Sequence, residues 1–384
     1  MEKTITKGWQ LLLLVPLLLA GFRATAGDTL RVESKFCHID RVNNIVLVNQ
    51  RVADINAGAR NWTHVQLDKV YALSQPVSSV RTDASYQATQ SGMTYRLYFT
   101  QLPVAEVDTR LPIMDSPSVY GRFSLVDTSG QQVQANMGIE YRGAFSQNYA
   151  KKSFELSFWD DTLGAASRDV SLLGLRNDNK YNLQAMFNEP LRFNGKVSNE
   201  LWMDLHQPYY RAAEPDAKSG VSMKYVELLL NGQYWGVYAL SERIDRKQLK
   251  LKKYNNGIVG ELYKGSDWGG AVTFTALPPF DNNSEIWGGF EYKHPEEQID
   301  WSNLYDFVGF VRNSADNSFY TAIQQKFHLG NAVDYYLFLN LMRATDNTGK
   351  NLYVARYKKN EPYFYVPWDM DGTFGTDFVG GNTG

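Results

Sequence analysis

The strongest pattern along the chain is a series of short segments in which apolar and polar residues alternate. Such alternation places apolar side chains on one face of a strand, and polar turns separate the segments. Because these strands follow one another without intervening helices, they indicate an antiparallel sheet rather than parallel β-α-β units. The expected strands are residues 95–99, 102–107, 121–126, 138–142 and 153–158.

The chain before this series carries a weaker pattern of the same kind. Three short apolar runs between residues 45 and 73 predict a small β-rich leader domain. Residues 78–93 are poor in aliphatic side chains and rich in Ser, Thr, Gln and Gly, so we expect a linker there. The leader and linker are therefore placed in residues 27–93, and the main domain in residues 94–384.

The second half of the chain changes from strand patterns to helix patterns. Asn231-Gly232 separates two apolar segments, and this dipeptide favours a two-residue hairpin turn with both residues at positive φ. Helical spacing follows in residues 301–311 and 331–344, with Asn331 as the expected N-cap. A sheet followed by helices predicts an α+β fold. In the second helix, four residues share one face: Val333, Leu337, Leu341 and Ala344.

The first residues have the three parts of a secretory signal peptide. Lys3 and Lys7 precede the apolar run LLLLVPLLLA at residues 11–20, and Ala24-Thr25-Ala26 is a small-residue cleavage site. The apolar run is shorter than a membrane-spanning helix requires. We therefore expect residues 1–26 to be removed on export to the periplasm, the cell surface or the medium, with no stable membrane span afterwards. An N-terminal membrane anchor is the alternative.

Charge and cysteine content exclude several classes of function. The formal net charge is −2, so no basic field indicates nucleic acid as a partner. A single cysteine, Cys37, excludes intramolecular disulfides and multi-cysteine metal sites. The chain also lacks HExxH, GxSxG and Walker-type motifs, so zinc-peptidase, serine-hydrolase and P-loop chemistries have no support.

The candidate chemistry lies in one stretch near the C-terminus. Asp346 is followed five residues later by Asn351, and then by Asp369 within the sequence WDMDG. This is the order of the catalytic and metal-binding loops of protein kinases, in which one carboxylate orients a hydroxyl and accepts its proton. An amide and a second carboxylate supply hard oxygen ligands for metal ions. The alternative is a pair of ordinary turns.

The residues between these positions predict a hairpin. Aromatic and β-branched side chains alternate in residues 352–357 and 363–367, on both sides of Lys358-Lys359-Asn360-Glu361. Such a hairpin brings Asn351 and Asp369 to the same end.

Two lysines are candidates for contact with nucleotide phosphates. Lys151 and Lys152 precede the expected strand at 153–158. Lys152 shares a face with the apolar side chains of that strand, whereas Lys151 shares one with Ser153 and Glu155. We favour Lys152, on the argument that a lysine on an apolar face is held inside a cleft. An exposed lysine on an edge strand is the alternative.

From about residue 102 the chain resembles the spore-coat protein H (CotH) kinase family of atypical protein kinases. The matching pieces occur in the family's order: RGAFSQNYAKKSFEL, LLGL, PLRFNGKVSNELW, VELLLNGQYWGVYALSERID, AVDYYLFLNLMRATDNTGKNLYV and VPWDMDGTF.

The resemblance implies a two-lobed atypical kinase fold with an antiparallel β-rich N-lobe and a helical C-lobe. It implies ATP and Mg²⁺ (or Mn²⁺) as cofactors, and Ser, Thr or Tyr hydroxyls of a protein as the acceptor. Asp346 then is the catalytic aspartate, and Asn351, Asp369 and Asp371 form the metal site. Lys152 or Lys151, together with Arg142 and Glu242, belong to the nucleotide site.

One departure from the family and two rival functions remain. Family members usually continue with further helices, whereas this sequence stops at Gly384, so we expect a truncated C-lobe. An exported protein also meets little ATP, which makes a non-enzymatic surface, envelope or coat-assembly protein with the same fold the alternative function. Carbohydrate binding or cleavage is the third reading, because the chain is rich in aromatic residues.

Overall fold

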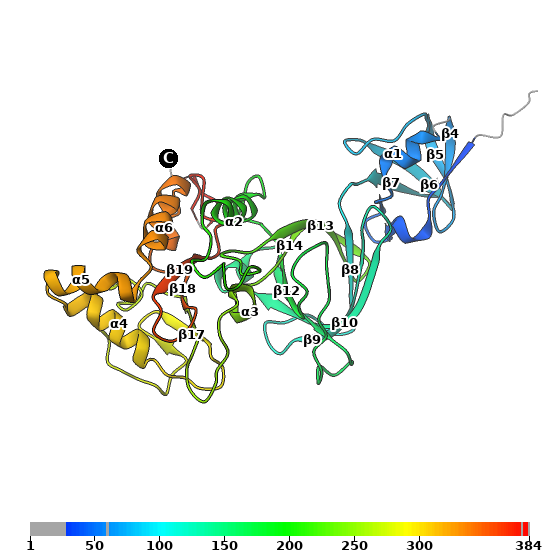
Figure 1. The fold of residues 1–384 in the computed structure, drawn as a ribbon. Coiled ribbons are helices and arrows are strands. Elements are labelled where there is room, and N and C mark those ends of the chain that lie inside the picture. Colours follow the sequence, from blue (N-terminus) through cyan, green and yellow to red (C-terminus); the bar gives the residue numbers. More distant parts are fainter. Residues whose placement is uncertain (1–27, 59–60, 378, 383–384) are drawn as a thin grey trace, which may run out of the picture.

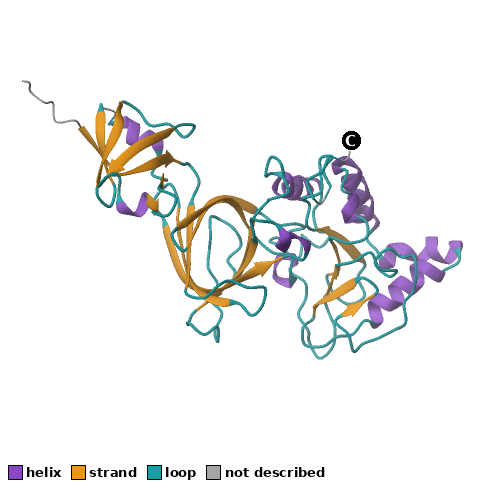
Figure 2. Cartoon of the chain, turned by 180° about the vertical axis from the view of Figure 1, so that it is seen from behind, coloured by secondary structure: helices purple, strands orange, loops and turns teal. Residues whose placement is uncertain are grey.

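The computed structural model describes residues 28–58, 61–377 and 379–382, and it has an α+β fold, as the sequence predicts. A seven-stranded sheet, a closed seven-stranded barrel and a five-stranded sheet follow one another along the molecule (Figure 1). Most helices gather around the last of these sheets (Figure 2). The expected signal peptide lies outside the described residues. Within the described ranges, no helix is long and apolar enough to span a membrane.

The first sheet has the order β1-β4-β5-β6-β7-β3-β2. Residues 78–93, expected as a linker, contain β6, which buries only Ala88 and so lacks the apolar face by which a strand is recognised in sequence. Because β7 pairs with both β6 and β3, this sheet extends to Phe99, beyond the boundary expected at residue 94. Its elements are β1 Asp28–Arg31, β2 Cys37–Asp40, β3 Ile45–Val48, α1 Val52–Ala57, β4 Trp62–Gln66, β5 Val70–Val77, β6 Ser85–Gln90 and β7 Met93–Phe99.

The barrel closes through one pairing that the sequence pattern does not reveal. Its order is β10-β11-β12-β14-β13-β8-β9, and β8 pairs with β13 in parallel while every other neighbour is antiparallel. The expected antiparallel sheet is therefore wrong at this pairing, and also at residues 95–99, which belong to β7 of the first sheet and pair in parallel with β3. The barrel strands are β8 Val104–Thr109, β9 Val119–Val126, β10 Gln132–Arg142, β11 Ser153–Trp159, β12 Lys180–Gln184, β13 Met223–Leu230 and β14 Gln233–Ser241.

The hairpin between β13 and β14 turns at Asn231-Gly232, as predicted. Asn231 has φ 50° and Gly232 has φ 71°, which is the combination that a two-residue turn of type I′ requires. This turn fixes the register in which Leu230 pairs with Gln233.

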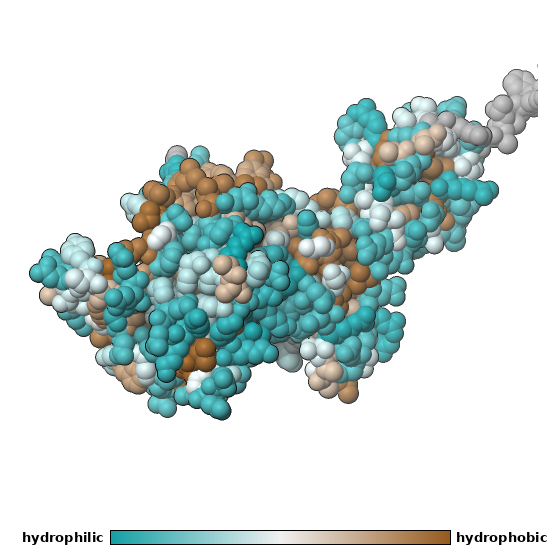
Figure 3. Space-filling view, in the orientation of Figure 1, coloured by the Kyte–Doolittle hydropathy of each residue, from teal (hydrophilic) through white to brown (hydrophobic). Residues whose placement is uncertain are grey.

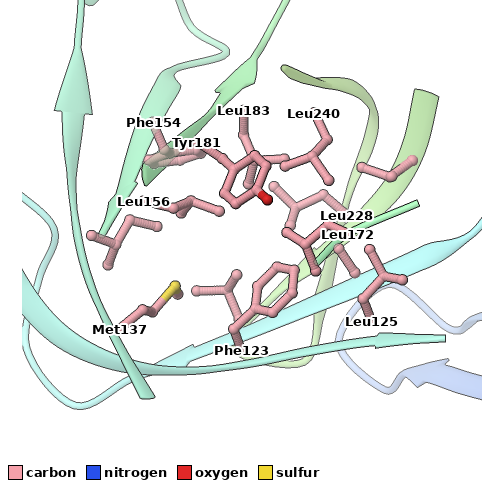
Figure 4. Close-up of a cluster of buried hydrophobic side chains, with 14 of the residues drawn as sticks. Phe123, Leu125, Met137, Phe154, Leu156, Leu172, Tyr181, Leu183, Leu228 and Leu240 are labelled. Atoms are coloured by element: carbon pink, nitrogen blue, oxygen red, sulfur yellow. The ribbon is translucent and has the colours of Figure 1, made fainter. Parts of the chain in front are cut away.

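The interior of the barrel is filled by side chains. Phe154 and Leu156 of β11 and Tyr181 of β12 have no exposed surface, and they point inward together with residues of the opposite wall (Figure 4). The strand alternation predicted for residues 153–158 therefore describes an inner apolar face and an outer polar face. A seven-stranded barrel packed in this way leaves no channel, so any binding site must lie outside it.

The third sheet is entirely antiparallel and carries the hairpin predicted for residues 352–367. Its order is β16-β17-β15-β18-β19, and the helical C-lobe expected from the resemblance thus contains a sheet as well. The strands are β15 Glu261–Gly265, β16 Ile286–Trp287, β17 Phe290–His294, β18 Leu352–Arg356 and β19 Tyr363–Pro367. The helices are α2 Asn194–Leu205, α3 Arg246–Leu249, α4 Ser302–Asn313, α5 Asp316–Lys326 and α6 Leu329–Met342.

Helix α6 begins earlier than predicted, and Asn331 does not cap it. The N-cap is His328, whose ring nitrogen accepts a hydrogen bond from the backbone N–H of Asn331. Asn331 is instead buried and donates from Nδ2 to the backbone oxygen of Tyr365 at 3.0 Å, which fixes α6 against β19. A capping role assigned from residue type alone is wrong here because the polar group is needed inside the molecule.

The face of α6 expected from helical spacing is exposed. Val333, Leu337 and Leu341 are 55%, 59% and 66% exposed. Figure 3, in the orientation of Figure 1, shows an apolar area at the top of the molecule, where α6 lies. The opposite face of α6 is buried through Tyr335, Phe338, Leu339 and Met342. The helix is thus apolar on both sides, which explains why its spacing does not show which side packs inward.

Phe154→Ala is expected to destabilise the protein by about 3–5 kcal/mol, because it empties a large volume in a fully packed interior. Chemical denaturation followed by circular dichroism measures the change. Leu163→Ala is the matched control, since Leu163 is 88% exposed, and it should change the free energy of unfolding by less than about 0.5 kcal/mol. Equal effects of the two substitutions would contradict the packed barrel.

Candidate active site

Asp346 lies in a short turn immediately after α6. The helix ends at Arg343, which adopts a left-handed conformation, and a 3₁₀ turn over Thr345–Asn347 follows. Asn351 donates from Nδ2 to Oδ2 of Asp346 at 2.8 Å, and Nζ of Lys350 lies 3.5 Å from the same oxygen. Asp346 and Asn351, five residues apart in the sequence, are therefore in direct contact through their side chains. This contact orients the Asp346 carboxylate.

The buried side chain of Asn347 joins this turn to the loop that carries Asp369. Its Nδ2 donates to the backbone oxygen of Asn351 at 2.8 Å and to that of Trp368 at 2.6 Å. The backbone N–H of Trp368 in turn donates to the oxygen of Asn351 at 3.0 Å. The β18–β19 hairpin thus brings Asn351 and Asp369 to one end, as predicted.

Asn351 and Asp369 share an uncommon backbone conformation. Their φ angles are 54° and 53°, in the left-handed region that few residues other than glycine adopt. Residues held in such conformations concentrate at functional sites.

The start of α2 holds the segment that follows Asp369. Asn194 donates from Nδ2 to the backbone oxygens of Asp371 at 2.9 Å and of Thr373 at 3.1 Å. The carboxylate of Asp371 accepts from Nδ2 of Asn188 at 2.6 Å and from the backbone N–H of Gly372 at 2.9 Å. These bonds fix a loop that has no regular secondary structure.

Three carboxylates crowd this end of the site. Burial raises the pKa of Asp371 to about 8, and the negative charges of Asp369 and Glu189 add to the shift. Burial likewise raises the pKa of Glu189 to about 7, with a further contribution from Asp369. A bound cation would relieve this repulsion, because an opposite charge favours the ionised form of each group.

Lys151 lines the same cleft as these carboxylates. It lines the cleft from the outer side of the barrel, its Nζ donates to the backbone oxygen of Val237, and it lies 4.1 Å from the centroid of the Tyr238 ring. Burial and the nearby charge of Arg192 lower the pKa of Lys151 to about 8. No ion pair between described residues involves Lys151.

Lys152, which the alternation argument favoured, is placed differently. It is not among the cleft-lining residues, and its Nζ donates to the backbone oxygen of Gln147. The argument assumed that the apolar face of this strand borders a cleft. That face instead fills the barrel, and the cleft lies on the side of Lys151, Ser153 and Glu155.

Of the two other residues assigned to the nucleotide site, only Arg142 lines the cleft. Its Nη1 donates to Oε1 of Gln184 at 2.7 Å, and its guanidinium lies 5.1 Å from the Trp368 ring centroid. Glu242 is buried elsewhere, and its Oε1 accepts from Nζ of Lys218 at 2.6 Å. Glu242 therefore joins the end of β14 to neighbouring loops.

The cleft has a volume of about 1010 Å³ and lies between the barrel and the third sheet. This is the size of a pocket for a nucleotide-sized ligand. The sequence-predicted residues that line it are Arg142, Lys151, Asp346, Asn351, Asp369 and Asp371.

Three residues of this region were not assigned to the site from sequence. Asn194 lies near the start of an apolar helical pattern, where residue type alone does not separate a site residue from a cap or turn residue. Glu189 and Asn347 carry no local signal, because their roles depend on partners that are distant in sequence or on backbone atoms.

Asn347→Ala is expected to loosen the two loops, since two backbone oxygens lose a buried donor. The expected cost is about 1–3 kcal/mol. Hydrogen exchange should show faster exchange at the N–H of Trp368, which bonds to Asn351. Asn340→Ala is the control, because exposed Asn340 bonds only within its own helix; unchanged exchange in both variants would contradict the bridging role.

Comparison with known proteins gives two matches. The family described as "CotH kinase protein" matches residues 139–381, well over half of the chain, beginning later than the expected residue 102. The chain is also 22% identical over 255 residues to a protein named "Inner spore coat protein H" from Bacillus subtilis (strain 168). That match covers 65% of this chain and 62% of the relative, which is less than two thirds of its length. The resemblance found in the sequence is thus confirmed, and the chain belongs to the CotH kinase protein family.

Proposed function

We propose that this chain is an exported atypical protein kinase that transfers the γ-phosphoryl group of ATP to a hydroxyl of a protein. The observation that carries the proposal is the presence of Asp346, Asn351 and Asp369 on the wall of one cleft that Lys151 also lines. In this proposal the barrel serves as the N-lobe, and the third sheet with its helices serves as the C-lobe.

Asp346 is the proposed base. Its carboxylate orients the acceptor hydroxyl and takes its proton, while the hydroxyl oxygen forms a bond to the γ-phosphorus and the bond from that phosphorus to the ADP oxygen breaks. The amide of Asn351 fixes Asp346 in the required orientation, and the ammonium of Lys350 stabilises its charge.

Asn351, Asp369 and Asp371 fit a site for Mg²⁺ or Mn²⁺. All three offer oxygen atoms, and the crowding of carboxylates beside them favours a cation. In the part of the chain that the structure describes, no group of three or more His, Cys, Asp or Glu side chains is placed to hold an ion by itself. We therefore propose that the nucleotide phosphates complete the coordination. A bound divalent ion supplies charge neutralisation of those phosphates.

Lys151 is the proposed phosphate contact. It is a half-buried cation that is paired with no carboxylate of the described residues, in a cleft where an anion would restore its charged state. Arg142 lines the same cleft and adds a second positive charge. The outer face of β11 borders the cleft, which supports Lys151 over Lys152 in this proposal.

A coat-assembly role without catalysis is the second candidate. It is supported by the similarity to the Bacillus subtilis relative named as an inner spore coat protein. Such a role requires the fold and its surfaces but has no need for Asp346, Asn351 and Asp369 in one cleft.

Asp369→Ala is expected to abolish metal-dependent ATP binding, whereas Asp346→Ala should bind ATP normally and lose transfer by at least about a hundredfold. Calorimetry with and without Mg²⁺ measures binding, and incorporation of labelled phosphate into casein or into the chain itself measures transfer. Wild-type protein that is folded and binds no ATP would favour the coat-assembly role. Thermal melting of both variants shows whether either substitution acts through folding instead.

ATP affinity is expected to fall as the pH rises above about 8. The pKa of Lys151 is lowered to about 8, so its positive charge is present below that pH and is lost above it, while ATP remains ionised throughout. Loss of the proton from one such group weakens ATP binding by up to about tenfold for each unit by which the pH rises. In Lys151→Arg the guanidinium stays charged, so calorimetry between about pH 7 and pH 9 should show a flatter profile. Identical profiles would exclude Lys151 as the phosphate contact.

A further inference from the structure

Glu189 is a buried carboxylate in the cleft for which the proposed function has no role. It is only 5% exposed, yet it is one of the residues that line the cleft. Its Oε1 accepts a hydrogen bond from the backbone N–H of Gly195 at 3.4 Å. Its Oε2 is buried and has no hydrogen-bond partner among the described residues.

Capping of α2 accounts for one oxygen of Glu189 and leaves the other unexplained. The helix begins at Asn194, so the contact from Gly195 to Oε1 satisfies one of its unpaired N–H groups. Burying Oε2 without a partner has a substantial desolvation cost. Native structures rarely keep such an atom unless something absent from the protein alone satisfies it.

The position of Glu189 points to the cation site. Its neighbour Asn188 binds the carboxylate of Asp371, and Asn194 binds the backbone oxygen of the same residue. The segment before α2 is thus attached to the Asp369–Asp371 loop on both sides of Glu189. Burial raises the pKa of Glu189, and the negative charge of Asp369 adds to the shift, in agreement with this position beside the loop.

The described residues provide no counter-ion for Glu189. None of their ion pairs includes it, and the nearby Arg192 directs its guanidinium to the backbone oxygens of Ala185 and Met186. The charge of Arg192 favours the ionised form of Glu189 without a direct contact, so Oε2 of Glu189 is still left without a partner.

We propose that Glu189 is a positioning residue for the divalent cation, and that its Oε2 accepts a hydrogen bond from a water molecule bound to that ion. The inference rests on the proposed function. Contact through water agrees with the absence of a three-carboxylate site among the described residues. It also suits Mg²⁺, which keeps several waters and is held by one or two carboxylates plus phosphates. Partners of this kind typically change metal affinity by about 10- to 100-fold.

The test compares Glu189→Gln with the wild type in Mn²⁺ binding. Titration of Mn²⁺ in the presence of a non-hydrolysable ATP analogue, followed by electron paramagnetic resonance, gives the dissociation constant. Glu189→Gln keeps the shape and an oxygen able to cap α2 but loses the charge, so Mn²⁺ should bind at least about tenfold more weakly. Glu189→Asp, which keeps the charge, should recover part of that loss.

Glu200→Gln is the matched control, because Glu200 lies on α2, the helix that Glu189 caps, and its side chain is 48% exposed. It should bind Mn²⁺ like the wild type. Thermal melting without metal separates the two roles of Glu189: a positioning role leaves the melting temperature of Glu189→Gln at or above that of the wild type. Wild-type Mn²⁺ affinity in Glu189→Gln would overturn this inference and leave the kinase proposal intact, whereas no Mn²⁺ binding by the wild type would overturn both.

Discussion

The geometry of the cleft depends on one buried amide. Asn347 donates to the backbone oxygens of Asn351 and Trp368, and no other side chain of the described residues bonds to both loops in this way. Sheet pairing ends at Leu352 and Pro367, and beyond it one backbone hydrogen bond joins Trp368 to Asn351. The two hydrogen bonds of Asn347 reinforce this end of the hairpin and hold the proposed site residues side by side.

The filled barrel determines from which side the cleft is built. Because Phe154, Leu156 and their neighbours occupy the interior, only the outer face of β11 is available to a ligand. The reason is that the pairing of β8 with β13 closes the sheet into a barrel. An open sheet has two accessible faces, whereas the closed barrel has only its outer face accessible. The packing of the barrel is therefore also the reason why Lys151, and not Lys152, lines the cleft.

The sequence predicted the structural features that depend on residues nearby in the chain. It did not predict the features that depend on contacts between residues far apart in the chain. The Asn231-Gly232 turn and the β18–β19 hairpin follow from local residue preferences, and both are present. Closure of the barrel and the use of the Asn331 side chain to bind Tyr365 require partners that no local window contains. The same holds for Glu189, since a glutamate before a helix has no distinguishing pattern until the opposing loop is in place.

The left-handed backbone at Asn351 and Asp369 also limits how these positions can evolve. Asn, Asp and Gly adopt that conformation at little cost, whereas β-branched and bulky residues do not. A descendant that abandoned catalysis but kept the hairpin would thus drift among these few residue types. Asp346, in the right-handed turn before them, is under no such restriction, and the residue that relatives carry at position 346 therefore indicates better than positions 351 and 369 whether the proposed phosphoryl transfer was retained.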